Sequence, residues 1–369
     1  MAEDPSLTAL IDRVRAARAD KTALNITGGN TKAFYGEAPS PTPPGQALAL
    51  AGLAGLAGIS SYEPSELVVT ARAGTPLAEL EAALAEKGQC LPFEPPRFGA
   101  AGTVGGMVAA GLAGPARAAV GGLRDYVLGA TLLNGRAELL RFGGQVMKNV
   151  AGYDVSRLLA GSMGMLGVIC EVSLKVLPVA VASATLRFEL DQASALQQLN
   201  RWGGQPLPVN ASAWWNGMLV LRLSGAAAAV QSAQTQLGGE AVDPALAAGF
   251  WTGLRDQTDE FFMRAAQAVA GGATLWRLSL PQTAAPLVLA GEQLVEWGGA
   301  QRWLVTPTAS HAVRAAAARA GGHATAFRGV KDGGALAPLS APLMRIHRAL
   351  KTEFDPDRIF NPGRLYAGL

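Results

Sequence analysis

The sequence predicts an α+β protein of two or three domains, and three observations lead to this expectation. The chain has 369 residues, and globular domains usually contain about 150. After Pro178, strand-like and helix-like runs begin to alternate, which predicts a second domain built on one sheet. Glycine and proline are frequent, with 45 and 22 copies, but show no collagen-like period, so many turns and close backbone contacts are expected.

The first part of the chain contains three patterns of regular structure before a long glycine-rich stretch. Apolar residues recur at helical spacing over 6–19. Residues 67–70 are typical of a short strand. A helix is predicted to begin at Pro76 and to end at Gly88, with its leucines facing inward. Residues 92–114 are dense in glycine and proline, which predicts a long loop.

The segment that precedes Pro178 is predicted to be mostly strand. The Asn134-Gly135 pair lies between two apolar runs and predicts a hairpin over 126–142. Residues 156–160 begin a short helix. Apolar and polar residues then alternate, which predicts a strand whose buried face carries Cys170, Val172, Leu174 and Val176.

The second half of the chain contains four runs of each kind. The strand-like runs are 185–190, 219–223, 275–280 and 303–305. The helix-like runs are 193–202, 226–237, 287–297 and 312–320, and Pro286 is a start signal for the third of them. A last helix is expected to turn Leu343, Ile346, Leu350 and Phe354 inward.

Composition and charge exclude several classes of protein. With 49% hydrophobic and 16% charged residues, the chain is neither disordered nor a charged tail protein. Its net charge of +3 is scattered along the sequence, which argues against nucleic-acid binding. The acidic, polar start is unlike a signal peptide, and the most apolar stretch, 47–59, is too short to span a bilayer. We therefore expect a cytoplasmic protein.

Standard catalytic and metal motifs are absent from the sequence. It has no G-x-x-x-x-G-K-[ST], G-x-G-x-x-G, H-E-x-x-H or G-x-S-x-G pattern. The only histidines, His311, His323 and His347, are not at metal-ligand spacing, so no metal site is expected. The only cysteines, Cys90 and Cys170, form no C-x-x-C pair, and two cysteines cannot ligate an iron–sulfur cluster.

Three runs of small residues are the candidates for ligand binding. They lie at 28–32, 99–111 and 161–169. A backbone without side chains can approach a ligand closely, and consecutive N–H groups can form an anion-binding nest. Three such turns beside strands fit a large phosphate-bearing ligand, although ordinary tight turns would leave the same pattern.

Residues 92–178, read in order, carry a resemblance to a known family. The text contains G-T-V-G-G-M-V-A-A-G, G-G-L-R-D-Y-V-L-G, K-N-V-A-G-Y-D and L-A-G-S-M-G-M-L-G-V-I, and the chain closes with N-P-G-R. This block resembles the FAD-binding domain of the vanillyl-alcohol oxidase / p-cresol methylhydroxylase superfamily. With residues 26–32 and 62–70, the chain is similar to the family of FAD-binding E subunits of bacterial glycolate oxidases. The combined set is more specific than any single glycine run.

The resemblance implies a two-subdomain FAD-binding fold of the vanillyl-alcohol oxidase type, with a smaller α/β cap that contains one antiparallel or mixed sheet. The FAD-binding domain would occupy residues 1–180, with a subdomain boundary near 60–90. The cap would occupy 181–335, and residues 336–369 would return to the FAD-binding domain.

The resemblance also implies which residues bind FAD. The turn at 28–32 and the run at 102–106 would hold the pyrophosphate, Asp125 would meet the adenine and ribose side, and Asn361 would approach the isoalloxazine. The full expected set is Gly28, Gly29, Asn30, Thr31, Lys32, Gly102, Thr103, Val104, Gly105, Gly106, Ala109, Gly111, Leu112, Asp125, Gly164, Gly167, Val168, Ile169 and Asn361. Lys148, Asn149 and Tyr153 lie in a family motif near the cofactor pocket, with a solvated turn as the alternative.

Two departures from the family bear on function. Some relatives attach flavin through a His or Cys, but residues 28–32 and 99–111 contain neither, so non-covalent FAD is expected. Relatives that oxidise 2-hydroxy acids share a His-x-His metal pair, and this chain has none. No catalytic residue is therefore assigned. The resemblance, together with the missing metal pair, implies a redox subunit of an oxidase complex for glycolate, D-lactate or another 2-hydroxy acid, which passes electrons from a catalytic FAD subunit toward an iron–sulfur subunit. It also implies that the chain reaches the inner membrane only as a peripheral part of that complex.

Two alternatives remain open at this point. The chain could be a self-sufficient FAD-dependent dehydrogenase whose base is His347, Arg124 or Tyr153, or a flavin-free scaffold of the same complex. The aromatic pairs Trp214-Trp215 and Phe250-Trp251 are either core residues or part of a partner surface.

Overall fold

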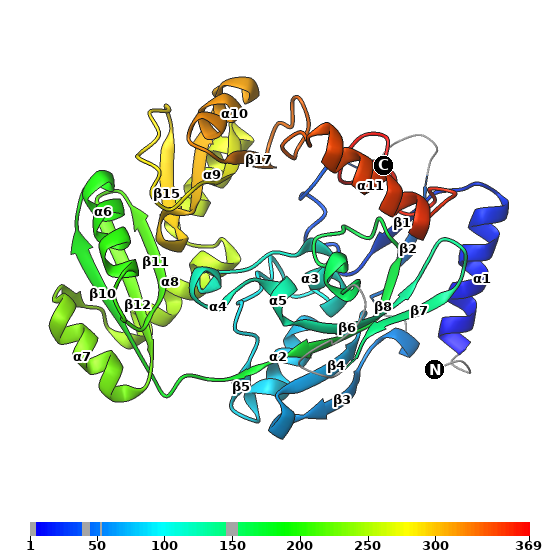
Figure 1. Ribbon diagram of the computed structural model, residues 1–369, viewed down its shortest axis with the longest axis horizontal. Coiled ribbons are helices and arrows are strands. Elements are labelled where there is room, and N and C mark those ends of the chain that lie inside the picture. The colour runs from blue at the N-terminus through cyan, green and yellow to red at the C-terminus, as the bar shows by residue number, and fades with distance from the viewer. Residues whose placement is uncertain (1–4, 39–44, 52–53, 145–153) are drawn as a thin grey trace.

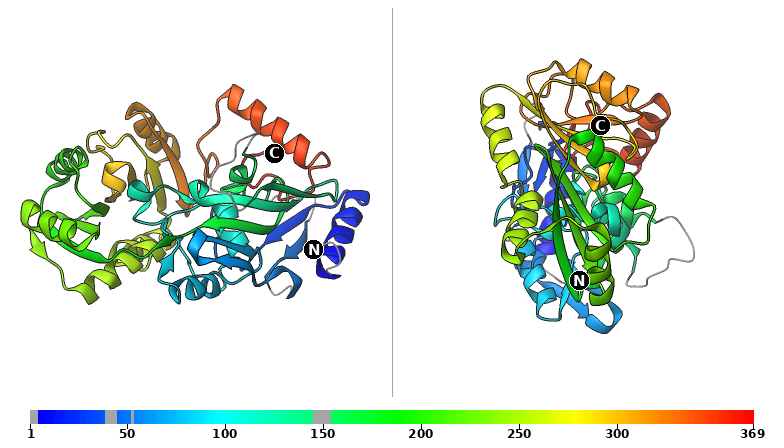
Figure 2. Two further views of the ribbon diagram at one scale, coloured as in Figure 1. Left: turned by 60° about the horizontal axis from the view of Figure 1, so that its bottom comes forward. Right: turned by 90° about the vertical axis from the view of Figure 1, so that its left-hand side faces the viewer.

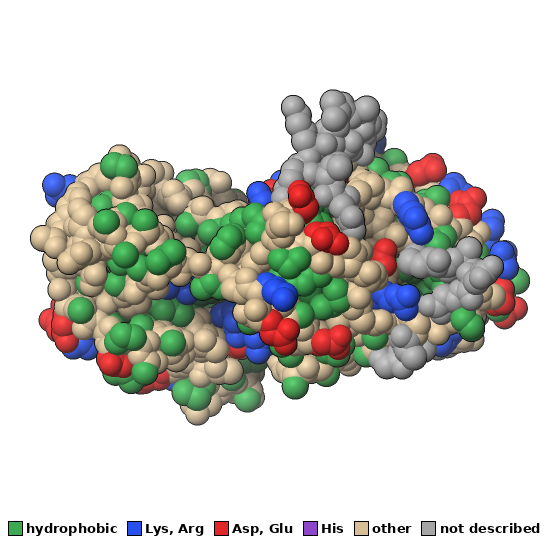
Figure 3. All heavy atoms as spheres, turned by 90° about the horizontal axis from the view of Figure 1, so that it is seen from below, with side chains coloured by type: hydrophobic (Ala, Val, Ile, Leu, Met, Phe, Trp, Pro, Cys, Tyr) green, Lys and Arg blue, Asp and Glu red, His purple; other side chains and the backbone are tan. Residues whose placement is uncertain are grey.

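The protein folds into two lobes that are joined side by side (Figures 1 and 2). The structure is a computed structural model that describes residues 5–38, 45–51, 54–144 and 154–369. The first lobe contains the N-terminal part of the chain and the C-terminal helix, and the second contains residues between Ala182 and Arg328. A hollow in which Lys and Arg side chains gather lies between the lobes on the face shown in Figure 3.

The first lobe is built on a five-stranded antiparallel sheet. Its strand order is β3 (Ile59–Glu63), β4 (Val68–Arg72), β8 (Val168–Lys175), β6 (Val127–Leu133) and β7 (Leu139–Gly143). Between β4 and β6 the chain forms four helices: α2 (Leu77–Ala85), α3 (Val104–Ala110), α4 (Arg117–Val120) and α5 (Leu123–Tyr126). The short strands β5 (Gln89–Cys90) and β9 (Leu177–Pro178) pair separately, and the 3₁₀ turns η2 (Pro64–Glu66) and η3 (Ser156–Leu159) complete the lobe. The predicted short helix at 156–160 is thus a 3₁₀ turn.

A small N-terminal unit packs against this sheet. It consists of α1 (Pro5–Ala19), the parallel pair β1 (Leu24–Thr27) and β2 (Gln46–Ala49), and the turn η1 (Ala54–Leu56). The predicted helix over 6–19 is confirmed, because α1 buries Leu7, Leu10 and Val14. These side chains share a hydrophobic cluster with Phe360 from the C-terminal segment, so the two ends of the chain meet here.

Leucines fix α2 on the sheet. Leu77, Leu80 and Leu84 are at most 1% exposed, as their spacing predicts, and Gly88 follows the helix with a φ of +64°. Pro76 is the residue before the helix rather than its first residue. Proline has no N–H to donate at this position, so it interrupts no hydrogen bond of the helix.

The prediction of one long loop over 92–114 is wrong in its middle, where α3 forms. Thr103 caps this helix by accepting a hydrogen bond from the Gly106 N–H at 3.1 Å, and Gly111 ends it with a φ of +63°. Glycine disfavours a helix by about 1 kcal/mol per residue. Buried contacts offset that cost, because Val104, Met107 and Val108 belong to the main core of the lobe.

The strand prediction at 170–176 is confirmed, but its inward face is interrupted. The pairing register of β6 and β8 shifts between Thr131 and Leu132, which marks a β-bulge. Cys170 consequently packs in the cluster with α1, while Val172 and Leu174 pack in the core with α2. The hairpin over 126–142 is confirmed as β6 and β7. Asn134 holds its connection by accepting hydrogen bonds from the N–H groups of Arg136 and Glu138.

The second lobe contains one eight-stranded antiparallel sheet. Its order is β13 (Glu240–Ala241), β10 (Ala182–Glu189), β12 (Met218–Gly225), β11 (Val209–Trp215), β15 (Glu292–Glu296), β16 (Gln301–Thr306), β14 (Thr274–Ser279) and β17 (His323–Arg328). Its helices are α6 (Gln192–Gly203), α7 (Ala227–Leu237), α8 (Pro244–Asp256), α9 (Glu260–Ala270) and α10 (Ser310–Arg319), with the turn η4 (Trp297–Gly299). The expected α+β class and the single cap sheet are confirmed.

The sheet of the second lobe is two similar halves joined edge to edge. In the first half, the order β13-β10-β12-β11 is that of a split βαβ motif, and β15-β16-β14-β17 repeats it in reverse. The first half has a helix, α6, between its first two strands, whereas the second half has none between β14 and β15. The predicted helix over 287–297 is therefore wrong. Residues 292–296 of this run instead form β15, which lies between β11 and β16.

The C-terminal helix α11 (Ala341–Phe354) returns to the first lobe. Phe354 is buried, but Leu343 is 46% and Ile346 54% exposed, so the expectation that Leu343 and Ile346 face inward is wrong.

The aromatic pairs of the second lobe belong to its core, because Trp251 is buried and Trp215 packs against Phe261. Within the described residues, no helix combines the length and hydrophobicity that crossing a membrane would require.

Candidate functional site

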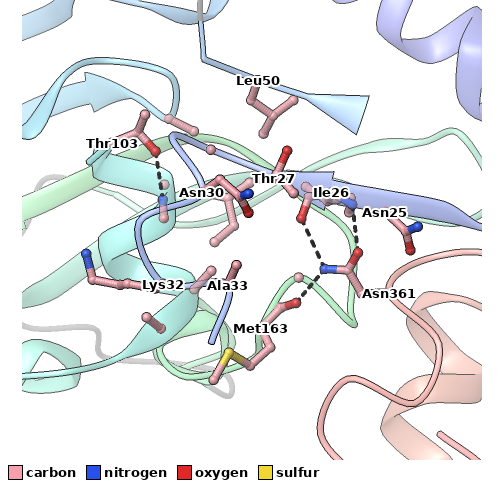
Figure 4. A pocket seen from close by; sticks show the side chains of 18 of the residues that line it. Asn25, Ile26, Thr27, Asn30, Lys32, Ala33, Leu50, Thr103, Met163 and Asn361 are labelled. Carbon is pink, nitrogen blue, oxygen red and sulfur yellow. Dashed lines mark hydrogen bonds between the residues drawn. The ribbon is translucent and has the colours of Figure 1, made fainter. Parts of the chain in front are cut away.

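The candidate site is a cleft of about 180 Å³ in the first lobe. Three segments that lie far apart in the sequence form its walls: the turn after β1, the start of α3, and the approach to β8. The C-terminal segment adds a fourth side (Figure 4). The described residues that line the cleft are Asn25, Ile26, Thr27, Gly28, Gly29, Asn30, Thr31, Lys32, Ala33, Leu50, Ala73, Thr103, Gly105, Gly106, Ala109, Ala110, Met163, Gly164, Gly167, Ile169, Asn361, Pro362 and Arg364.

The turn after β1 offers unpaired backbone donors to the cleft. No hydrogen bond among the described residues uses the N–H of Gly28, Gly29, Asn30 or Thr31. Asn30 has a φ of +58°, which breaks the extended path of β1 and bends the backbone. Consecutive N–H groups in such a bend form a concave site that favours anions.

The start of α3 contributes a different kind of wall. Its N–H groups are already used, since Val104 donates to the Thr75 carbonyl, Gly105 to the Ala73 carbonyl and Gly106 to the Thr103 hydroxyl. This segment therefore supplies a surface without side chains and one hydroxyl group, rather than a second nest of free donors.

The glycines of the first turn are required by the contact between these two walls. A Cβ on Gly28 would lie 2.3 Å from Oγ1 of Thr103, and a Cβ on Gly29 would lie 1.4 Å from the carbonyl oxygen of Ala101. No side chain can occupy either position unless the turn moves away from the 99–106 segment. The glycines thus hold the donor-rich turn against the α3 wall.

Asn361 closes the cleft from the C-terminal side (Figure 4). Its Oδ1 accepts a hydrogen bond from the Ile26 N–H at 2.7 Å, and its Nδ2 donates to the Met163 carbonyl at 2.6 Å. A Cβ on Gly164 would lie 2.7 Å from this amide nitrogen. One side chain therefore connects β1, the segment before β8 and the C-terminal tail.

A buried ion pair anchors the tail that carries Asn361. Lys351 and Asp355 are fully buried, with Nζ 2.7 Å from Oδ2. Nζ of Lys351 also donates to the carbonyls of Met165 and Phe360, and the Asp355 carboxylate accepts from the N–H groups of Ile359 and Phe360. Every polar atom of the pair has partners, which is the condition under which a buried pair is tolerated.

Two cationic side chains, Lys32 and Arg364, line the cleft. Burial lowers the pKa of Lys32 to about 8, although the negative charge of Asp256 acts in the opposite direction. Arg364 donates to the backbone carbonyls of Ala33 and Glu37, and burial lowers its pKa as well. The cleft therefore combines free N–H donors with positive charge, which suits a phosphate-bearing ligand.

Most of the sequence-predicted site residues come together in this cleft, and six do not line it. Val104, Leu112 and Val168 are buried in hydrophobic clusters. The Gly102 carbonyl accepts from the Leu77 N–H. Gly111 ends α3 where a Cβ would lie 2.7 Å from the Gly161 nitrogen. Asp125 accepts from the Gly122 N–H at 2.8 Å, in the first turn of α5.

The histidines, cysteines and remaining candidates lie outside the lining of the cleft. This holds for Cys90, Cys170, His311, His323 and His347. Nδ1 of His347 is 2.9 Å from the Leu343 carbonyl oxygen, one turn earlier on α11. Arg124 is exposed on α5. Lys148, Asn149 and Tyr153 lie outside the described residues.

Sequence reasoning missed several lining residues. Most are direct neighbours of the predicted turns, and Arg364 lies in the N-P-G-R text that drew attention to Asn361. Leu50 and Ala73 carry no local signal, because they reach the cleft through the pairing of β2 with β1 and the end of β4.

Comparison with known proteins gives the family. A family model described as an FAD binding domain matches residues 6–143. Glycolate oxidase subunit GlcE of Escherichia coli (strain K12) is 48% identical over 361 residues, covering 98% of this chain and 97% of that protein. Glycolate oxidase subunit GlcD of Bacillus subtilis (strain 168) is 31% identical over 128 residues, or 35% of this chain and 27% of that protein.

Among solved structures, alkyldihydroxyacetonephosphate synthase superposes with a TM-score of 0.65 at 14% identity, covering 96% of this chain and 75% of that one. At this identity the likeness shows the fold alone, an FAD-linked oxidase fold with an antiparallel-sheet domain beside the FAD-binding domain. The match to the Escherichia coli protein, in contrast, extends along nearly the whole of both chains. This chain therefore belongs to the glycolate oxidase subunit GlcE family of FAD-linked oxidoreductases.

Proposed function

We propose that this chain binds FAD non-covalently in the described cleft and acts as an electron-transferring subunit of a 2-hydroxy-acid oxidase complex. A catalytic flavoprotein subunit would oxidise glycolate or D-lactate, and an iron–sulfur subunit would receive the electrons. The Escherichia coli relative of the same family is a subunit of glycolate oxidase by name, which supports an assembly with partners.

The observation that carries the FAD assignment is the set of four unpaired N–H groups at residues 28–31. None of these groups has a partner among the described residues, and pyrophosphate oxygens would accept hydrogen bonds from this set. Lys32 and Arg364 would add positive charge beside the same oxygens. Thr103, Gly105, Gly106 and Ala109 would present a surface that a flat ligand can approach closely.

The six predicted residues that do not line the cleft would support its walls without contacting the ligand. In our proposal Gly102, Val104, Gly111 and Leu112 hold the ends and the packed face of α3, Asp125 holds the turn into α5, and Val168 fixes the strand beside Ile169. Gly164, Gly167 and Asn361 would contact the ligand directly, because they line the cleft.

The domain boundaries belong to the same proposal. The FAD-binding domain would occupy residues 1–180, the cap 181–335 and the C-terminal return 336–369, and the separate sheets of the two lobes support this division.

The positions of the nucleophilic side chains support the proposal of non-covalent attachment. The chain has two cysteines and three histidines in total. None of them lines the cleft. Burial also raises the pKa of the Cys170 thiol to about 12, so it stays protonated and unreactive.

The side chains of the cleft favour electron transfer over substrate oxidation by this chain itself. FAD would supply reversible electron transfer when bound. Among the described lining residues there is no His, Asp, Glu, Cys or Tyr, and the amine of Lys32, whose pKa is about 8, is assigned here to the pyrophosphate rather than to a substrate proton. Loss of a positioned base commonly lowers a rate about 10²–10⁴-fold. Substrate oxidation is therefore assigned to the partner subunit.

The test compares the chain alone with its complex. The FAD-loaded chain is assayed with glycolate and an artificial electron acceptor, and the reconstituted complex is assayed under the same conditions. We expect turnover in the complex and at least about a hundredfold less in the isolated chain. Equal turnover without partners would establish a self-sufficient dehydrogenase instead. A chain that remains colourless with excess FAD but still assembles would be a scaffold.

A further inference from the structure

The apolar stripe of α11 is only half covered by the rest of the protein. It consists of Leu343, Ile346, Leu350 and Phe354, which recur at helical spacing. In the second half of the helix, Phe354 belongs to the main core of the first lobe and Leu350 packs against that core. In the first half, Leu343 and Ile346 are exposed. One continuous stripe therefore runs from the core out onto the surface.

Contacts near its C-terminal end fix α11 on the first lobe. The rings of Phe354 and Phe142 have their centres 6.0 Å apart, and Nζ of Lys351 donates to the Met165 carbonyl at 2.8 Å. In Figure 1 and in the left view of Figure 2, the helix lies along the outer edge of the lobe. The exposed first half is thus part of a helix that is anchored elsewhere, so a partner can pack on it without rearranging the backbone.

The exposed half of α11 also carries positive charge that no acidic group balances. Arg345 and Arg348 are exposed, and neither forms an ion pair or a side-chain hydrogen bond with any residue that the structure describes. The acidic side chain of the helix, Glu353, already pairs with Arg136. An apolar centre with a polar rim is typical of a protein–protein interface, and a cationic rim is complementary to an acidic one.

These charges argue against a second copy of this chain as the occupant. In a two-fold dimer each patch meets the same patch of the other copy, so the arginines of both copies would face one another. Like charges brought together in this way cost free energy. A lipid surface is also a poorer match, because an interfacial helix lays its whole apolar face in the membrane, and here half of that face is packed inside the protein.

The surface lies on the side of the cleft that Asn361 closes. The ring of His347, on α11, contacts the ring of Tyr366 edge-on, with the centres 6.2 Å apart. Tyr366 closely follows Arg364, which lines the cleft. The buried ion pair at the end of α11 anchors the tail that carries Asn361. A protein bound to α11 would therefore lie beside a wall of the proposed flavin site, where a partner that exchanges electrons with the flavin is expected.

We propose that the exposed half of α11 is the docking surface for the iron–sulfur subunit of the oxidase complex. Leu343 and Ile346 form its apolar centre, and Arg345 and Arg348 pair with carboxylates of that subunit. A cluster ligated by four cysteine thiolates carries a net negative charge, so the field of such a partner favours a cationic surface. The assignment rests on the proposed function, because it takes the iron–sulfur subunit as the acceptor of the electrons.

Retention of the partner subunits by the tagged, FAD-loaded full chain tests this surface. The chain is immobilised, the purified iron–sulfur and catalytic subunits are titrated onto it together, and the half-saturating concentration of each is measured. We expect Leu343→Ser/Ile346→Ser to weaken retention of the iron–sulfur subunit by about tenfold or more, as for residues at the centre of an interface. The control Val288→Ser replaces an exposed apolar side chain of the second lobe and should leave retention unchanged.

The contribution of the charges is measured by its dependence on salt. Arg345→Glu/Arg348→Glu should weaken retention most at low ionic strength, and its difference from the unaltered chain should shrink as sodium chloride is added, because salt screens exposed charges. A variant that is merely misfolded would show no such dependence. Arg201→Glu, at an exposed position on α6, is the matched control. The flavin absorbance and melting temperature of every variant should equal those of the unaltered chain.

Four results would overturn the inference. Equal retention of the iron–sulfur subunit by Leu343→Ser/Ile346→Ser and by the unaltered chain would place its docking surface elsewhere. Selective loss of the catalytic subunit would assign the surface to that subunit. Self-association of the isolated chain that this variant abolishes would show a dimer contact, and abolished binding to phosphatidylglycerol–phosphatidylethanolamine vesicles would show a lipid contact. An unaltered chain that retains neither subunit contradicts the proposed function first.

Discussion

The amide of Asn361 substitutes for a strand partner of Ile26, since Oδ1 accepts the Ile26 N–H at 2.7 Å and Nδ2 donates to the Met163 carbonyl at 2.6 Å. The Asn361 backbone N–H also donates to the Leu24 carbonyl at 3.0 Å. A residue near the C-terminus thereby continues the hydrogen bonding of the first strand and forms one side of the cleft.

Replacement of Asn361 by alanine is expected to open the cleft. The change leaves the Ile26 N–H and the Met163 carbonyl without partners, and each unsatisfied buried group costs about 1–3 kcal/mol. We expect a lower melting temperature of the apo chain and a weaker FAD affinity in fluorescence titrations. Gln231→Ala, at an exposed position on α7, serves as the control. An Asn361→Ala variant with unchanged FAD affinity would show that this amide is not part of the binding site.

Glycine is required at position 29 for steric reasons. The Cβ of an alanine would lie 1.4 Å from the Ala101 carbonyl oxygen, so Gly29→Ala must push the 28–32 turn away from the α3 wall. We expect it to destabilise the protein by more than about 2 kcal/mol in urea titrations and to abolish FAD binding. The matched control is Gly249→Ala on α8, where nothing lies within 4 Å of the added Cβ. That change should stabilise the helix by up to about 1 kcal/mol. Retention of FAD by Gly29→Ala would contradict the described contact.

Lys32 makes stability and FAD affinity depend on pH in opposite directions. Its pKa is about 8 in the fold and 10.5 in the unfolded chain, so the unfolded state holds more protons between these values. Stability of the apo chain should therefore rise with pH in that window. FAD affinity should fall as pH rises above about 8, because the neutral amine no longer attracts pyrophosphate.

The Lys32→Met variant should remove both trends. Urea unfolding of the apo chain and fluorescence titration with FAD, each measured from neutral pH upward, provide the two readouts. The same pH dependence in Lys32→Met would assign the titration to another group.

Lys351→Met should have a large effect although it lies outside the cleft. It leaves the fully buried Asp355 carboxylate without its cation, and breaking a buried pair in this way costs about 3–5 kcal/mol. The C-terminal tail should detach and FAD affinity should fall with it. The double variant Lys351→Met/Asp355→Asn removes both charges and should recover part of the stability. A single variant as stable as the unaltered chain would mean that the pair does not anchor the tail.

The sequence was most informative where a pattern is local. Helical spacing predicted α1 and the inward leucines of α2, and Asn134-Gly135 predicted the β6–β7 hairpin. Patterns failed where tertiary contacts decide. Residues 292–296 form a strand because two neighbouring strands pair with them, and the glycines of α3 are helical because Val104, Met107 and Val108 are buried.

The candidate site divides in the same way. The glycine runs predicted the turn at 28–32 and the wall at Thr103, but no pattern distinguishes free N–H groups from those already paired. Within the part of the chain that the structure describes, the N–H groups of Gly28 to Thr31 are free, whereas those of Val104, Gly105 and Gly106 at the start of α3 donate to Thr75, Ala73 and Thr103.

The most direct test of the central claim is the visible absorption spectrum of the purified chain, repeated on the supernatant after acid precipitation. The account predicts a yellow protein with a flavin spectrum whose colour passes entirely into the supernatant, as it must for FAD held only by hydrogen bonds, charge and packing. Colour that stays with the precipitate would contradict non-covalent binding. A protein that remains colourless after incubation with FAD would contradict the assignment of the cleft itself.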